Sequence, residues 1–100
     1  MASLARKFDV RLATGERLVE MRDFVDLACE RAVAVFQPDI AHCGGLLAAS
    51  RIATLAAGFN ISIAPHNPLG VIASSAGLHF ALATDNFLVQ EEMSAHFSAA

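Results

Sequence analysis

The stretch Val33-Ala34-Val35-Phe36-Gln37-Pro38-Asp39 decides the fold, because a short apolar run ends there at a turn and a carboxylate. The run does not alternate apolar with polar residues, which is typical of a strand buried on both faces. A helical stretch follows over about residues 46–58, with Gly44 and Gly45 at its start and Gly58-Phe59-Asn60 at its end. These residues predict a unit of strand, turn and helix.

The same unit repeats in both directions along the chain. Apolar runs at residues 10–13, 61–64 and 87–89 predict three more strands, and helical stretches cover about residues 23–31 and 70–83. The resulting order β-α-β-α-β-α-β predicts right-handed crossovers and a parallel sheet. Eight such units would make about 200 residues, close to the size of a (β/α)₈ barrel. The sequence therefore predicts an α/β fold that is half of a TIM-type barrel.

Composition excludes several classes of protein. The 100 residues are 55% hydrophobic and 17% charged, which does not suit a disordered tail, a charged binding arm or a disulfide scaffold. Twelve of the seventeen charged side chains lie in residues 1–31, so five remain to cover the other sixty-nine residues. The net charge of −3 lacks the basic footprint of a nucleic-acid-binding protein.

Neither a membrane span nor a secretory signal is predicted. The most apolar stretch, residues 69–83, would be about 22 Å long as a helix, short of a bilayer core of about 30 Å. The first residues contain no apolar core of a signal peptide. Cys29 and Cys43 are too few for a disulfide framework, so a reducing, cytoplasmic setting is expected.

The helix predicted near residues 70–83 has no charged side chain, and we expect it to pack against another domain or subunit.

Polar residues follow each predicted strand at a similar distance: Glu16, Asp39, His66 and Glu91. The carboxyl ends of parallel strands meet at one edge of a sheet, where barrel enzymes build their active sites. Asp39 and His66 follow neighbouring strands, whose backbones lie about 4.8 Å apart, so contact between them is feasible. These four side chains are the candidate site.

Four blocks of sequence carry a resemblance to a known family: Ala-Thr-Gly-Glu-Arg (13–17), Gln-Pro-Asp-Ile-Ala-His-Cys-Gly-Gly (37–45), Ala-Pro-His-Asn-Pro-Leu-Gly (64–70) and Asn-Phe-Leu-Val-Gln-Glu (86–91). They resemble the mandelate racemase subgroup of the enolase superfamily, and within it sugar-acid dehydratases of the galactonate dehydratase type. The resemblance runs from about residue 4 to residue 91. It implies a capping domain followed by a (β/α)₇β barrel, of which this chain would hold the last four strands. Residues 1–92 would then be the C-terminal half of the barrel domain, and residues 93–100 a short tail that departs from the family.

The resemblance also implies roles for the four candidate residues. Glu16 would be the third carboxylate ligand of an essential Mg²⁺, which stabilises the enediolate formed when a proton leaves the carbon next to a carboxylate. His66 would be the general base, with Asp39 accepting its imidazole N–H. Glu91 would hydrogen-bond the substrate carboxylate. Loss of the β-hydroxyl would then give a 2-keto-3-deoxy sugar acid.

In that family two further metal ligands, the acid-side residue and the capping domain belong to segments outside these 100 residues. The chain is therefore expected to be a fragment or truncated product of a Mg²⁺-dependent dehydratase that neither binds Mg²⁺ tightly nor turns over alone. A racemase or cycloisomerase parent stays open. The alternative is a non-catalytic half-barrel that pairs with another copy or with a complementary half. The expected partners are a sugar acid in the complete enzyme and either a second copy of the chain or a complementary barrel half. Neither a nucleic acid nor a membrane is expected as a partner.

Other residues near the strand ends have two interpretations each. Arg17 could orient Glu16 or bind substrate, and an ordinary ion pair is equally plausible. For His42 a packing or capping role is favoured over a chemical one. Cys43 lies near a helix N-terminus, which can lower a thiol pKa, but a packed small residue is favoured. Gly44-Gly45 is not followed by the Lys-Ser/Thr of a P-loop, which favours a tight turn.

Overall fold

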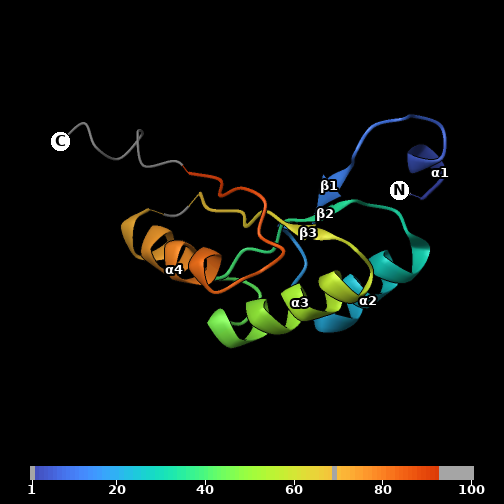
Figure 1. The fold of residues 1–100 in the computed structure, drawn as a ribbon. Coiled ribbons are helices and arrows are strands. Elements are labelled where there is room, and N and C mark those ends of the chain that lie inside the picture. Colours follow the sequence, from blue (N-terminus) through green and yellow to red (C-terminus); the bar gives the residue numbers. More distant parts are fainter. Residues whose placement is uncertain (1, 69, 93–100) are drawn as a thin grey trace.

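The structure is a computed structural model that describes residues 2–68 and 70–92 of the 100-residue chain (Figure 1). Its elements follow one another as α1 (Ala2–Ala5), β1 (Ala13–Thr14), α2 (Met21–Glu30), β2 (Val35–Phe36), α3 (Leu46–Gly58), β3 (Ser62–Ile63) and α4 (Val71–Leu82). Helices and strands alternate after α1, which confirms the predicted α/β order. The predicted tail, residues 93–100, lies outside the described residues.

The three strands form a parallel sheet in the order β1-β2-β3. Ala13 pairs with Val35, and Phe36 pairs with Ile63. The fourth predicted strand, residues 87–89, is reduced to a single parallel bridge between Ile63 and Phe87. Strand order in space therefore equals order along the chain, as in the wall of a barrel, and the predicted half-barrel is confirmed.

Burial separates the inner from the outer strands. Both residues of β2 are buried, as predicted for a strand covered on both faces. The prediction for residues 10–13 is wrong, because β1 begins only at Ala13 and Val10 is 62% exposed. No described strand pairs with the outer edge of β1, which leaves Val10 exposed although Leu12 packs partly against the core.

The core lies between the sheet and helices α2 and α3, which run side by side along it (Figure 1). Phe24 of α2 and Phe36 of β2 meet edge to face, with ring centroids 5.2 Å apart. The core stripe of α3 consists of small and branched residues, Ala49, Ile52, Ala53 and Ala56. Small alanines let this helix approach the strands closely, which fixes the strand ends that carry the candidate site.

The turn between β2 and α3 is built from Gly44 and Gly45. Both have positive φ angles, +110° and +92°, which a residue with a side chain rarely adopts. The N–H of Gly45 donates to the carbonyl of Ile40 at 2.9 Å, which closes the turn. The predicted tight turn is confirmed, and α3 begins directly after it.

Helix α4 presents an apolar face to solvent. Its exposed side chains include Ile72 at 88% and Leu82 at 81%, together with Val71 and Leu78. The sequence predicted this face from the lack of charged residues in the helix. Across the described residues, we find no helix with the length and apolar character needed to traverse a membrane.

Candidate active site

The backbone brings Asp39 and His66 directly opposite each other. The two residues form an isolated parallel bridge in the same register as Phe36 and Ile63, three residues further along each segment. The N–H of His66 donates to the carbonyl of Pro38 at 3.0 Å. The ring nitrogen Nδ1 of His66 lies 3.1 Å from Oδ2 of Asp39. The predicted contact between these side chains is therefore present at the carboxyl edge of the sheet.

The loop after β2 folds around the Asp39 carboxylate, which is almost fully buried. Its Oδ1 accepts the N–H groups of Ala41 at 2.9 Å and His42 at 3.2 Å. This arrangement holds the carboxylate still and leaves Oδ2 for the His66 ring. An ionised carboxylate can only accept hydrogen bonds, so the ring donates from Nδ1. When Nδ1 donates in this way, the lone pair of the imidazole ring lies on Nε2.

Glu91 lies on the other side of the same ring. Its N–H donates to the carbonyl of Pro65 at 3.2 Å, which places the residue beside the His66 segment. Its Oε2 lies 3.6 Å from Nε2 of His66 and accepts the N–H of Asn67 at 3.3 Å. The imidazole is thus held between a buried carboxylate at Nδ1 and a half-exposed one at Nε2.

Glu16 reaches the site through a glycine at the end of β1. Gly15 has a φ of +135°, and a Cβ there would lie only 3.0 Å from the Phe24 ring and 3.1 Å from the nitrogen of Gln37. Glu16 lines a cavity of about 490 Å³ with Arg17, Val19, His42 and His66. It therefore shares a cavity with His66, although no hydrogen bond or ion pair joins it to Asp39, His66 or Glu91.

Residues 2–68 and 70–92 contain no cluster of three or more histidine, cysteine or carboxylate side chains arranged to hold a metal ion. Glu16 makes no hydrogen bond or ion pair to another residue in these ranges, so its oxygens are available. The described chain thus offers one free carboxylate to the cavity, and not a complete ligand set.

His42 is a site residue that the sequence analysis undervalued. Its ring nitrogen Nδ1 lies 3.4 Å from Oδ2 of Asp39, the same oxygen that His66 contacts, and its side chain is 57% exposed. The backbone N–H of His42 does cap the Asp39 turn, as favoured, but the ring also faces the cavity. A histidine three residues after the aspartate was the available signal.

Cys43 belongs to the core and not to the site. It is 5% exposed, and burial, together with the nearby Asp39 charge, raises the pKa of its thiol above the ordinary value of 9.0. The interpretation as a packed small residue is confirmed. The alternative, a lowered thiol pKa, is wrong, because burial and the Asp39 charge outweigh the backbone hydrogen bonds that lower the pKa.

Residues 1–99 match the family described as enolase C-terminal domain-like. The chain belongs to this family. A D-galactonate dehydratase from Xanthomonas oryzae pv. oryzae (strain PXO99A) is 36% identical over 89 residues, which are 89% of this chain and 23% of that protein. A D-galactonate dehydratase from Pectobacterium atrosepticum is 34% identical over 96 residues, 95% of this chain and 25% of that protein.

Solved structures of the enolase superfamily share the fold of the chain. An enolase from Agrobacterium radiobacter, solved with bound Na and L-malate, has a TM-score of 0.89 and 38% identity, covering 92% of this chain and 23% of that one. A mandelate racemase/muconate lactonizing enzyme-like protein from Roseovarius sp. TM1035 has a TM-score of 0.91 and 33% identity over 96% and 24% of the two chains. The predicted family is confirmed, and the chain spans about a quarter of the length of these relatives.

Proposed function

We propose that the chain supplies the proton-abstracting part of a Mg²⁺-dependent sugar-acid dehydratase site. The observation that carries this proposal is the His66 ring, held between Asp39 and Glu91 at the carboxyl edge of the sheet. The similarity to D-galactonate dehydratases supports an aldonic acid as substrate class.

In this proposal His66 is the general base. Nδ1 donates to Asp39, so Nε2 carries the lone pair that would take the proton from the carbon next to the substrate carboxylate. The imidazole becomes positively charged as it accepts this proton. The buried Asp39 carboxylate, fixed by two backbone N–H groups, stabilises that charge without having to reorient.

Glu91 acts on the substrate carboxylate. In this proposal a hydrogen bond between Glu91 and a carboxylate oxygen of the substrate strengthens as negative charge moves onto that oxygen. Its position beside Nε2 of His66 supports this role, because that nitrogen would take the proton from the neighbouring carbon. The β-carbon–oxygen bond then breaks, and the hydroxyl leaves as water with a proton that the acid-side residue of the complete enzyme would supply. The resulting enol tautomerises to a 2-keto-3-deoxy acid.

Glu16 is the residue that would hold the metal. It is a hard oxygen ligand of the kind that Mg²⁺ prefers, and it is free of other described partners in the cavity it shares with His66. Bound there, Mg²⁺ would supply positive charge to the developing enediolate. One carboxylate cannot complete an octahedral shell, so we expect weak Mg²⁺ binding by the 100-residue chain and no turnover.

The test is a chimera, because the chain matches about a quarter of each relative. Residues 4–91 replace the matching segment of the Xanthomonas oryzae D-galactonate dehydratase, and Mg²⁺-dependent dehydration of D-galactonate is measured. We expect an active chimera in which His66→Asn and Glu16→Gln each lower kcat by at least about 100-fold, the scale of a lost general base.

Ser75→Ala is the matched control for this chimera, because Ser75 is exposed on α4 and makes no hydrogen bond to a described residue. It should leave kcat and KM unchanged. A folded chimera that stays inactive, or one whose activity survives His66→Asn, would overturn the proposal.

The second candidate function is a non-catalytic half-barrel that associates with another copy or a complementary half. The apolar face of α4 and the open edges of the sheet favour it, since both call for a partner. Sedimentation of the purified chain tests this second candidate. A stable species of twice the chain mass supports association, and a monomer at all concentrations opposes it.

A cytoplasmic location is also part of the proposal. Cys29 and Cys43 are both free, which suits a reducing compartment. Fractionation of cells that express the tagged chain tests this location, and recovery from an oxidising compartment would contradict it.

A further inference from the structure

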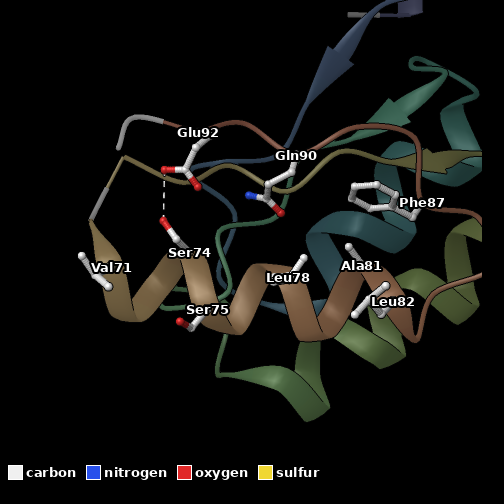
Figure 2. A pocket seen from close by; sticks show the side chains of 9 residues that line it. All are labelled: Val71, Ser74, Ser75, Leu78, Ala81, Leu82, Phe87, Gln90 and Glu92. Carbon is white, nitrogen blue, oxygen red and sulfur yellow. Dashed lines mark hydrogen bonds between the residues drawn. The ribbon is translucent and has the colours of Figure 1, made fainter. Parts of the chain in front are cut away.

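A polar cluster lies directly behind the candidate base, at the first turns of α4. It consists of Asn67, Ser74 and Glu92. The side-chain Nδ2 of Asn67 lies 2.9 Å from Oγ of Ser74 and 3.5 Å from Oε2 of Glu92. The Ser74 hydroxyl lies 3.0 Å from Oε1 of Glu92, as the dashed line in Figure 2 shows. Asn67 is 3% exposed, so this is a buried polar residue that needs its partners.

The cluster connects the two residues on either side of the His66–Glu91 contact. Asn67 directly follows His66, and Glu92 directly follows Glu91. His66 and Glu91 meet at the cavity, where Nε2 of His66 and Oε2 of Glu91 are 3.6 Å apart. Asn67 and Glu92, the residues that follow them, both contact Ser74. One helix residue therefore joins two chain segments that are 25 residues apart.

Little else holds the carboxylate of Glu91 in place. Its side chain is 41% exposed, and among the described residues its carboxylate contacts only His66 and the N–H of Asn67. A half-exposed glutamate without restraint would sample several rotamers and lose its distance to the base. The neighbouring cluster restricts the backbone at Glu92 and at Asn67, from both sides of that contact.

We propose that Asn67, Ser74 and Glu92 are positioning residues that fix the distance between Nε2 of His66 and the Glu91 carboxylate. The catalytic meaning of this distance rests on the proposed function. The geometric effect does not, because it follows from hydrogen bonds within the chain. Loss of the Ser74 hydroxyl should loosen both segments while the core stays intact.

The experiment is NMR of the ¹⁵N-labelled 100-residue chain and its Ser74→Ala variant. Losing both hydrogen bonds that Ser74 makes to Asn67 and Glu92 should speed hydrogen exchange of the Asn67 backbone amide by at least about tenfold. Amides in the core of α3, such as Ile52 and Ala53, should keep their exchange rates. The Nε2 resonance of His66 should shift as Glu91 moves, and Nδ1, held by Asp39, should stay.

Three comparisons make the result specific. Ser75→Ala makes the same change one residue along on the exposed surface and should have no effect, whereas Ser74→Thr retains a hydroxyl and should restore the original spectrum. Glu92→Ala removes the exposed carboxylate of the cluster, so it tests the inference even if Ser74→Ala does not fold. Equal effects of Ser74→Ala and Ser75→Ala, or an unchanged Asn67 amide in Glu92→Ala, would overturn the inference.

The two proposals fail separately. An inactive dehydratase chimera with a clear Ser74→Ala effect in the NMR spectra removes the proposed function and leaves the positioning role of the cluster. An active chimera with no such effect removes the positioning role alone.

Discussion

At the scale of single residues, Asp39 organises the candidate site. It is buried, yet each of its oxygens is hydrogen-bonded, one to the backbone of the following loop and one to His66. Such a group is inexpensive to bury only while all its partners remain. The loop, the contact with His66 and the neighbouring His42 therefore depend on one carboxylate.

Asp39→Ala should lower the free energy of unfolding by about 1–3 kcal/mol, because the N–H groups of Ala41 and His42 lose their acceptor. Urea denaturation measures the loss. Asp85→Ala is the control, since Asp85 is exposed and its side chain makes no hydrogen bond to a described residue, and it should stay within about 0.5 kcal/mol of the parent. Equal losses for both variants would contradict the role given to Asp39.

The two cysteines should differ in reactivity. Cys29 is exposed and Cys43 is buried, with the pKa of the Cys43 thiol raised by burial. A thiol reagent at pH 8 should label Cys29 first and Cys43 only on unfolding, because the thiolate is the reactive form. Mass spectrometry of Cys29→Ala and Cys43→Ala identifies the labelled thiol. Rapid labelling of the folded Cys29→Ala variant would count against burial of Cys43.

The same pKa direction has a consequence for stability. The folded state keeps the Cys43 proton at pH values where the unfolded chain has released it, so the free energy of unfolding should fall as pH rises past 9.0. Cys43→Ala should have a smaller fall over the same range. Urea denaturation at pH 8 and pH 10 measures both slopes, and identical slopes would contradict the assignment.

At the scale of elements, helix α4 packs closely at Gly77 against the segment that contains Gln90. A Cβ at Gly77 would lie 2.8 Å from Oε1 of Gln90, whose Nε2 donates to the carbonyl of Glu91 at 2.9 Å. Oε1 is buried and has no hydrogen-bond partner among the described residues. Gly77 therefore leaves room for the side chain of Gln90, which lies above the helix in Figure 2.

Gly77→Ala should fail to give the stabilisation of about 1 kcal/mol that alanine usually brings to a helix, because Gln90 must move and lose its hydrogen bonds. In the Gln90→Ala background the same change should stabilise the chain. Thermal or urea unfolding of all four proteins measures this coupling. Additive effects would show that the two residues do not meet in solution.

The helices were predictable to within two residues at most of their ends, because local residues determine those ends. Residues 46–58 were predicted and found as α3, since glycines mark its start and Gly58-Phe59-Asn60 its stop. Strands were harder, because pairing depends on neighbours: residues 10–13 read as a buried strand but lie at an edge. The contact between Asp39 and His66 followed from strand spacing, whereas the ring of His42 depends on the path of a loop that spacing does not describe.

At the scale of the whole molecule, apolar surface collects at one end. Helix α4 and the segment at residues 87–92 enclose a hollow of about 630 Å³, with Leu78, Leu82 and Phe87 at its apolar side (Figure 2). Together with Ile72, these side chains form an apolar surface and are not scattered singly over the molecule. The surface explains the low charge of this half of the sequence.

The chain should associate in a concentration-dependent way through this surface. Ile72→Glu and Leu82→Glu should shift sedimentation toward the monomer without lowering the free energy of unfolding, because both side chains are already exposed. Ala57→Glu, on the exposed side of α3, adds the same charge elsewhere and should leave association unchanged. Loss of association in all three variants would point to net charge and not to this surface.

The parallel bridge between Asp39 and His66 has a consequence for folding fidelity. A slip of one residue between these segments would place Pro65 or Asn67 opposite Asp39, and neither side chain could replace the imidazole. Misaligned molecules would thus lose the hydrogen bond between Nδ1 of His66 and Asp39. The NMR signal of the hydrogen-bonded Nδ1 proton would therefore report the alignment of these two segments.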